Sequence, residues 1–291
     1  TGKGIGPTYS DKAACVGLRV GDILHNFDEK YKALKARHEQ ILRDLHYTDY
    51  DITEEEQKWM QGIEYMRKFN LTDTEYELNH ALAEGKNVLA EGAQGSLLDI
   101  DHGTYPYVSS SSTTSGGVCT GLGIAPNSIG HVFGIFKAYS TRVGGGPFPV
   151  ELFDETGDTI RHIGNEYGAV TGRNRRCGWL DLVALKYAIM INGVTDLVMM
   201  KGDVLDGFDT IKVCTAYTKD GETVTEMPYD TEGWQPVYEE LPGWKTDLTA
   251  IRAEKDFPAA FASYIAYIEK ATGTPIKIVS VGPDREATII R

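Results

Sequence analysis

Three arginines stand close together in a segment that also contains glycine. Arg173, Arg175 and Arg176 fall within Gly168-Ala-Val-Thr-Gly-Arg-Asn-Arg-Arg-Cys-Gly-Trp, just before a predicted helix. Backbone N–H groups and the positive end of a helix favour an anion. Each guanidinium adds a planar fork that matches a carboxylate or phosphate, and a hydrogen bond to a charged group contributes about 1.5–3 kcal/mol. We therefore predict an anion site here, with a solvated basic loop as the alternative.

A second motif, Met200-Lys201-Gly202-Asp203, follows an apolar run that predicts a strand. It resembles the guanine-reading element of GTP-binding proteins, in which Lys-x-Asp follows a strand. The Asp203 carboxylate can accept hydrogen bonds from both N1–H and the exocyclic amine of guanine, and the Lys201 stem can cover the ring. Adenine does not present that donor pair, so it would leave the carboxylate unpaired. A surface turn is the alternative, because Lys-x-Asp is common at strand ends.

Two further polar segments carry candidate residues. Ser280 and Gly282 lie in Ser-Val-Gly-Pro-Asp-Arg after the last predicted strand, where they suit the rim of a base pocket or simply a tight turn. Gln94 lies in Glu91-Gly-Ala-Gln-Gly and is a candidate for hydrogen bonding to a nucleobase or phosphate. Asp99, Asp101 and His102 follow it, but no further ligand stands at metal-binding spacing, so we predict an ordinary polar loop.

Composition excludes several classes of protein. The chain has 291 residues and a formal net charge of −13, from 29 Lys and Arg against 42 Asp and Glu. Such a charge argues against a nucleic-acid-binding protein, because it repels a phosphate backbone. Four widely spaced cysteines without a CxxC pair predict reduced thiols in the cytoplasm. No apolar run approaches the roughly 18 residues of a membrane span, and no GxxxxGK[ST] phosphate loop occurs.

Hydrophobic periodicity predicts the elements that position these residues. From residue 87 onward strands alternate with helices, which predicts an α/β fold with a mostly parallel central sheet and a small antiparallel ribbon. Helices are expected at the Tyr31–Leu45 stripe, at Trp59–Met66 after Glu54-Glu-Glu, and at 76–84, 179–192 and 258–271. Strands are expected at 87–90, 131–139, 196–200, 211–217, 222–227 and 276–279, with an irregular stretch over 99–123. No linker marks a boundary, so residues 1–291 are expected to form one domain with a helical subregion near 28–84.

Several long motifs in this order resemble the adenylosuccinate synthetase family. They cover almost the whole chain: Gly4-Ile-Gly-Pro-Thr-Tyr-Ser-Asp-Lys, Glu91-Gly-Ala-Gln-Gly-Ser-Leu-Leu-Asp-Ile-Asp-His-Gly-Thr-Tyr-Pro-Tyr, Thr141-Arg-Val-Gly-Gly-Gly-Pro-Phe-Pro, Thr171-Gly-Arg-Asn-Arg-Arg-Cys-Gly-Trp-Leu-Asp, Asp203-Val-Leu-Asp-Gly and Gly282-Pro-Asp-Arg. The resemblance implies a P-loop-NTPase-like sheet. It also implies a homodimeric ligase of purine nucleotide synthesis, in which GTP with Mg²⁺ phosphorylates the 6-oxygen of IMP and L-aspartate then displaces phosphate to give adenylosuccinate.

The resemblance also assigns site residues by motif. The implied IMP contacts are Thr1, Gln94, Ser109 and Arg173, with Ser109 standing where the family has Thr. The implied aspartate contacts are Val170, Thr171, Arg173 and Arg175. The implied GTP contacts are Arg175, Lys201, Asp203, Ser280 and Gly282.

Two departures from the family pattern give a second hypothesis. The family's phosphate loop, its catalytic Asp and His and its Mg²⁺ ligands come before the position of Thr1, so we expect an amino-terminally truncated segment that is inactive alone. Cys15 stands where the family has an Arg that reaches the IMP phosphate of the other subunit. These features favour, as the alternative, a non-catalytic guanine-nucleotide-binding or dimer-partner protein. The upstream sequence would discriminate between the two.

Overall fold

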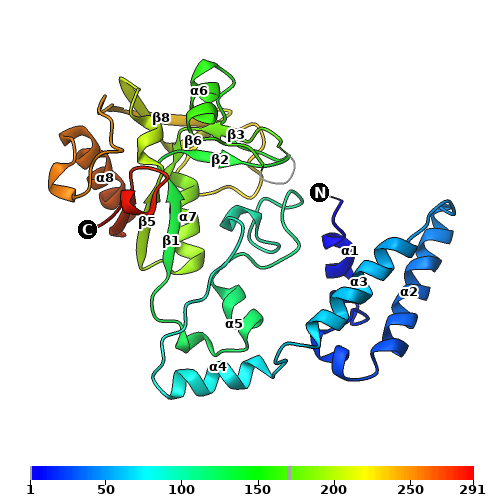
Figure 1. Ribbon diagram of the computed structural model, residues 1–291. Coiled ribbons are helices and arrows are strands. Elements are labelled where there is room, and N and C mark those ends of the chain that lie inside the picture. The colour runs from blue at the N-terminus through cyan, green and yellow to red at the C-terminus, as the bar shows by residue number, and fades with distance from the viewer. Residues whose placement is uncertain (1, 169–171) are drawn as a thin grey trace. The chain divides into compact units, whose positions relative to one another are not determined.

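The computed structural model describes residues 2–168 and 172–291 and divides the chain into two compact units, 1–89 and 90–291 (Figure 1). Thr1, Val170 and Thr171, which carry predicted ligand contacts, lie outside the described residues. Within the described ranges, no helix is both long and apolar enough to cross a membrane.

The first unit is helical, as the periodicity predicts. Its α-helices are α1 (Ile5–Ala13), α2 (Phe27–Asp44), α3 (Thr53–Met66) and α4 (Thr74–Ala83). Glu54, Glu55 and Glu56 lie in the first turn of α3, where their negative charge interacts favourably with the positive end of the helix dipole. Ile23, Phe27 and Ile63 form a small buried cluster, against which the ring of Tyr31 packs. The stripes on α2 and α3 therefore serve packing.

The strand predicted at 87–90 is wrong. Residues 87–93 carry no regular structure, and the Leu89 side chain is 89% exposed. An apolar run becomes a strand only when a neighbouring strand accepts its backbone hydrogen bonds, and among the described residues this run has no such neighbour. The stretch 99–123, predicted to be irregular, is so only in part, because α5 (Gly116–Leu122) occupies its end.

The second unit is built on the predicted, mostly parallel sheet. Its strand order is β1-β5-β9-β10, in which β1, β5 and β9 are parallel and β10 is antiparallel to β9. The bounds are β1 (Phe133–Lys137), β5 (Asp196–Met200), β9 (Ile276–Ser280) and β10 (Thr288–Ile290). The fold class predicted from the sequence is confirmed, and β5 has the predicted bounds.

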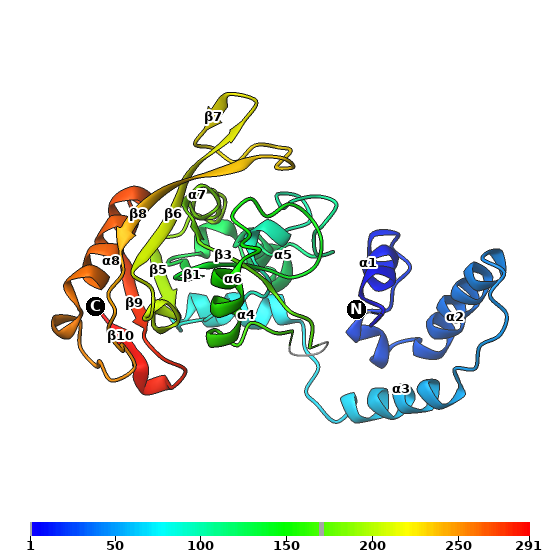
Figure 2. The same cartoon turned by 90° about the horizontal axis from the view of Figure 1, so that it is seen from above.

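An antiparallel ribbon extends a second sheet. In that sheet β4 (Leu180–Asp181) runs parallel to β6 (Thr210–Lys219), and β6 pairs antiparallel with β7 (Glu222–Val224) and β8 (Gln235–Pro242). Figure 2 shows β7 at the tip of the ribbon that β6 and β8 form. Asp220 and Gly221, with φ of 51° and 85°, make the turn between β6 and β7. This confirms the predicted hairpin, since short hairpin turns favour positive φ.

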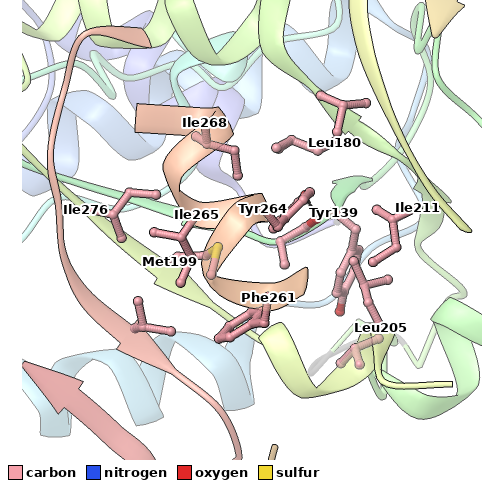
Figure 3. Close-up of a cluster of buried hydrophobic side chains, with 14 of the residues drawn as sticks. Tyr139, Leu180, Met199, Leu205, Ile211, Phe261, Tyr264, Ile265, Ile268 and Ile276 are labelled. Atoms are coloured by element: carbon pink, nitrogen blue, oxygen red, sulfur yellow. Dashed lines mark hydrogen bonds between the residues drawn. The ribbon is translucent and has the colours of Figure 1, made fainter. Parts of the chain in front are cut away.

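Three helices join the sheets to a common core. They are α6 (Glu155–Ile163), α7 (Leu182–Asn192) and α8 (Ala259–Thr272). Buried side chains from α8 share one cluster with Met199 of β5 and Ile276 of β9, and Ile265 lies beside both (Figure 3). The helix predicted from Trp179 begins later, because the Asp181 side chain accepts a hydrogen bond from the Ala184 N–H at 3.1 Å and caps α7.

Candidate functional site

Three parallel strands end at one edge of the sheet of the second unit. Lys137, at the end of β1, pairs with Met200, at the end of β5, and Met199 pairs with Val279 near the end of β9. The residues that follow β5 and end β9, Lys201 and Ser280, therefore come to the same edge. In parallel sheets this edge is the usual place for a ligand.

The Lys-Gly-Asp motif forms a tight turn at this edge. Lys201 has a φ of 61°, and a Cβ at Gly202 would lie 2.9 Å from Cζ of Phe261, so the turn requires glycine there. Asp203 is half-buried in the short helix η4 (Gly202–Leu205) that follows. Burial raises the pKa of the Asp203 carboxyl, although the Lys201 ammonium opposes that rise. The turn thus presents a half-buried carboxylate, and two hydrogen-bond donors from a ligand would stabilise its charged form.

The turn after β9 is built around a hydroxyl and a glycine. Ser280 is 3% exposed, and its Oγ donates a hydrogen bond to the Gly282 carbonyl at 3.0 Å. A Cβ at Gly282 would meet Cβ of Ala287 at 3.1 Å. Both residues therefore serve the tight turn, and both also stand at the edge where the parallel strands end.

The arginine segment is the second arm of a short hairpin. The Gly168 N–H donates to the Arg173 carbonyl at 2.8 Å, and the Arg175 N–H donates to the Glu166 carbonyl at 2.9 Å. Tyr167 and Asn174 form the bridge between these bonds. Arg173 is exposed. The hairpin places Arg173 and Arg175 two residues apart on its second arm.

The predicted contribution of a helix end to this anion site is wrong. The strands β3 (Arg176–Gly178) and β4 separate the arginines from the start of α7. The Asp181 carboxylate already occupies an N–H of that helix terminus. Because the dipole effect falls off within the first turn, the anion preference of this loop must come from its own guanidinium and N–H groups.

The three arginines do not share one role. Arg176 donates a hydrogen bond from Nε to Glu151 at 2.8 Å and from Nη1 to the Gly146 carbonyl at 2.7 Å, and its guanidinium lies over the Phe148 ring. These contacts tie Arg176 to the segment 144–151. The Nε of Arg175, by contrast, is buried and has no hydrogen-bond partner among the described residues. Arg175 therefore has one guanidinium donor that the described residues leave unsatisfied, and its side chain is 30% exposed.

A buried carboxylate that sequence reasoning missed joins these parts. Glu166 is fully buried and accepts hydrogen bonds from the Nζ atoms of Lys137 at 2.7 Å and Lys201 at 2.9 Å. The Tyr139 hydroxyl at 2.6 Å and the Arg175 Nη1 at 2.8 Å complete the set. Burial alone would raise the pKa of Glu166, but the bonds from Lys137, Tyr139 and Lys201 outweigh it and lower the pKa to about 2. The only signal in the sequence was the position of Glu166, two residues before the arginine loop.

The loop that carries Gln94 and Ser109 is organised by one buried aspartate. Asp99 is 1% exposed and accepts hydrogen bonds from the N–H groups of Asp101, His102, Thr113 and Thr114 at 2.7–3.3 Å. Burial alone would raise the pKa of this carboxyl, yet the backbone bonds hold it below its usual value. No group of three or more His, Cys, Asp or Glu residues in the described ranges could hold a metal ion.

Gln94 and Ser109, the two predicted IMP contacts on this loop, are both at least partly accessible to a ligand. Gln94 is exposed with a φ of 66°, and Ser109 is half-buried with its Oγ 3.3 Å from the Ser111 Oγ. Both belong to the second unit.

Cys15 lies in the first unit, just past the end of α1. It is exposed with a φ of 60°. Lys12 and Arg19 do not share a helix face with Cys15, because α1 ends at Ala13 and Arg19 is the N-cap of the next short helix, η1 (Val20–Leu24). Cys15 instead lines a cavity of about 470 Å³ together with Arg19, Lys30 and Arg37.

Comparison with known proteins gives the family. The family model described as adenylosuccinate synthetase matches residues 1–289. The adenylosuccinate synthetases of Bacteroides thetaiotaomicron and Porphyromonas gingivalis are 64% and 59% identical to this chain, each over 292 aligned residues that cover all of it and 69% of the relative. The solved structure of fully ligated adenylosuccinate synthetase from Plasmodium falciparum has a TM-score of 0.92 and 39% identity, and covers 99% of this chain and 69% of that one.

The α/β fold and the likeness to the synthetases above place the chain in a class of nucleotide-using ligases. More particularly, the chain belongs to the adenylosuccinate synthetase family, as the sequence motifs indicate.

Proposed function

We propose that the protein containing this chain joins IMP and L-aspartate to adenylosuccinate with GTP as the energy source, and that the sheet edge of the second unit is its substrate site. The family supports the reaction. The observation that carries the site is the Glu166 cluster, which brings the arginine hairpin and the Lys-Gly-Asp turn together at one edge.

The guanine base is assigned to the turns after β5 and β9. The Asp203 carboxylate accepts the two donors of guanine, the Lys201 stem covers one ring face, and Ser280 with Gly282 forms the rim. Asp203 is half-buried, so an adenine base that offers no donor pair would leave its charge poorly solvated. This geometry supports GTP over ATP as co-substrate.

The hairpin arginines are assigned to anions. Arg175, with its buried and unpartnered Nε, suits the aspartate carboxylate and the GTP phosphates, and the exposed Arg173 suits aspartate and IMP. Val170 and Thr171 belong to the same loop and are proposed to contact aspartate. Such forks hold the nucleophile in the geometry for attack on C6 after the oxygen of IMP has been phosphorylated, because an unmodified oxygen is a poor leaving group.

Gln94 and Ser109 are proposed IMP contacts, with Gln94 supporting catalysis by hydrogen bonding. Thr1 is proposed to contact the IMP phosphate. We also infer that the enzyme is a cytoplasmic homodimer and that Mg²⁺ accompanies the phosphates of GTP. The residues described here do not form a metal-binding cluster, so no step above runs through a metal ion.

A non-catalytic guanine-nucleotide-binding or dimer-partner protein remains the second candidate. Cys15 favours it, because the thiol cannot make the cationic contact to the IMP phosphate that the family's arginine provides.

Turnover decides between the two candidates. The protein expressed from its complete gene is mixed with GTP, IMP, L-aspartate and Mg²⁺, and adenylosuccinate is followed by absorbance. We expect turnover that requires all three substrates and that ATP does not support. Guanine-nucleotide binding without turnover would favour the non-catalytic protein. We expect residues 1–291 expressed alone to be inactive, since they cover 69% of their relatives.

A further inference from the structure

The cluster around Glu166 holds more positive charge than its one carboxylate balances. Lys137, Lys201 and Arg175 all donate to it, and the Tyr139 hydroxyl adds a neutral donor. The carboxylate is fully buried, whereas the three cationic side chains are 25–35% exposed. The excess positive charge is therefore on the solvent side of the carboxylate, where an anionic ligand can reach it.

The same carboxylate joins three elements that are distant in the sequence. The Glu166 Oε1 accepts hydrogen bonds from Lys137 at the end of β1 and from Lys201 just after β5. Its Oε2 accepts a hydrogen bond from Arg175 on the hairpin. The Glu166 backbone adds a second tie to the hairpin, through its carbonyl and the Arg175 N–H. Lys201 also donates to the Gly164 carbonyl at 2.6 Å, so its ammonium is held on two sides.

Arg175 is consequently fixed at Nη1, which donates to Glu166, whereas its buried Nε has no partner among the described residues and its side chain as a whole is 30% exposed. A buried donor without a partner costs free energy unless a ligand satisfies it. Glu166 therefore aims the guanidinium and leaves the rest of the fork for an anion.

Resting on the proposed function, we propose that Glu166 is a positioning residue of the ligase: it sets Arg175 and Lys201 in binding-competent places, and so supports aspartate and GTP binding at the same time. Glu166 need not touch a substrate. Because Glu166 is buried, it acts through Arg175 and Lys201, two of the side chains that donate to it.

Glu166→Gln tests this at nearly constant shape. A carboxylate accepts at both oxygens, but an amide has one accepting oxygen and one donating NH₂ group. The NH₂ must then face either Arg175 or the two lysines, all of which are donors. We expect the KM values for GTP and aspartate to rise together by about tenfold to a hundredfold, the range of one lost charge-assisted contact, with a smaller change in the KM for IMP.

Asp181→Asn is the matched control. Asp181 is also a buried carboxylate, 5% exposed, with a tyrosine donor, the Tyr217 hydroxyl at 2.5 Å, but it caps α7 and holds no lysine or arginine in the contacts described. We expect it to lower thermal stability and to leave the KM values for GTP and aspartate within about twofold. Equal rises in KM for both variants would overturn the proposal, because they would reflect a general loss of packing.

A second variant covers the case in which Glu166→Gln does not fold. Tyr139→Phe removes one of the four donors and keeps the ring, so we expect the same pair of KM values to rise by a few-fold. Unchanged KM values in the folded variants would overturn the proposal.

Calorimetric binding of GDP separates this proposal from the ligase function. If the parent protein shows no turnover but GDP binds more weakly to Glu166→Gln than to Asp181→Asn, the ligase function fails and the positioning role stands. If the parent turns over and Glu166→Gln matches it in KM and GDP affinity, the positioning role fails and the ligase function stands.

Discussion

At the scale of single residues, side chains of one type take different roles because their surroundings differ. Arg142 is 8% exposed and donates to the Gly145 carbonyl at 2.8 Å and to Thr104 Oγ1 at 2.9 Å, so it holds loops together. Arg176 has similar ties. Arg175 is 30% exposed, and its Nε has no partner among the described residues. A guanidinium whose nitrogens have protein partners stabilises structure, whereas we propose that Arg175 binds an anion.

Asp203→Asn should abolish the preference for GTP. An amide cannot accept from both guanine donors, and the loss of one charged pair corresponds to about 2–3 kcal/mol, or tens- to a hundredfold in kcat/KM for GTP. Steady-state kinetics with GTP and ATP measure it in the complete protein. Unchanged kinetics would show that the Lys-Gly-Asp turn is only structural.

Arg173→Leu should raise the KM for aspartate strongly and lower kcat, because the planar fork is proposed to hold the substrate carboxylate for attack. Arg173→Lys should restore little, since an ammonium is a point charge without the fork. Arg176→Lys serves as the comparison, and its main effect should be on stability. Full activity of the leucine variant would mean that the loop is merely solvated and basic.

Cys15→Arg should lower the KM for IMP. The new guanidinium would join Arg19, Lys30 and Arg37 at the cavity that Cys15 lines, with a gain of about 1.5–3 kcal/mol if the contact is dry and less if it is wet. Both side chains carry a Cβ, so the positive φ at this position penalises them alike.

The gain should need the dimer, because the proposed contact crosses to the other subunit. Kinetics of Cys15→Arg and of the neutral control Cys15→Ser, measured across protein concentrations, decide this. If all variants have the same KM for IMP, other groups anchor the phosphate.

At the scale of elements, buried side chains replace regular structure where the chain has little of it. The stretch 99–115 has no helix or strand, yet its backbone N–H groups converge on Asp99. Similarly, Asp154 caps α6 through the N–H groups of Thr156 and Gly157 at 3.0 and 3.2 Å. These carboxylates fix segments on which the proposed site residues depend.

Asp99→Ala should destabilise the second unit by about 3 kcal/mol or more, because it leaves four N–H groups without their acceptor. Unfolding in urea measures the free energy of unfolding, and the KM for IMP should rise because Gln94 and Ser109 lie on the loop that Asp99 organises. Asp101→Ala is the control, since Asp101 is exposed. A loss of stability no greater than that of the control would contradict the role of Asp99.

At the scale of the whole molecule, charge is distributed unevenly. The chain has a net charge of −13, yet Lys137, Lys201 and Arg175 gather around Glu166 at one edge. The overall field opposes anionic substrates, so the local cations must supply their attraction at close range.

Acid stability reports on the same cluster. The pKa of Glu166 is about 2 in the folded protein, below the ordinary value of 4.5. Its contribution is therefore fully present above pH 4.5 and is lost as the pH falls toward 2, by about 3 kcal/mol in total. Denaturant unfolding from pH 6 to 2 should show the difference between the parent and Glu166→Gln shrinking over this window. A difference that does not vary with pH would contradict the assignment.

Local pattern in the sequence was enough for much of the fold and the family. The stripes of α2 and α3, the bounds of β5 and the turn at Asp220 depend on near neighbours in the chain, so periodicity and turn chemistry could reveal them. The long motifs indicated the family, and two of them marked the ends of β5 and β9 as a candidate site.

Only the tertiary structure determined the strand pairings and side-chain contacts that depend on residues far apart in the sequence. The run 87–90 looks like a strand but has no partner strand in the described chain, and Arg176 looks like a ligand fork but is taken up by Glu151. Glu166 carried almost no signal, because its importance comes from Lys137, Arg175 and Lys201, which lie 9 to 35 positions away. Sequence periodicity reports which face of an element is buried, whereas hydrogen bonding between elements depends on how the sheets and loops meet in space.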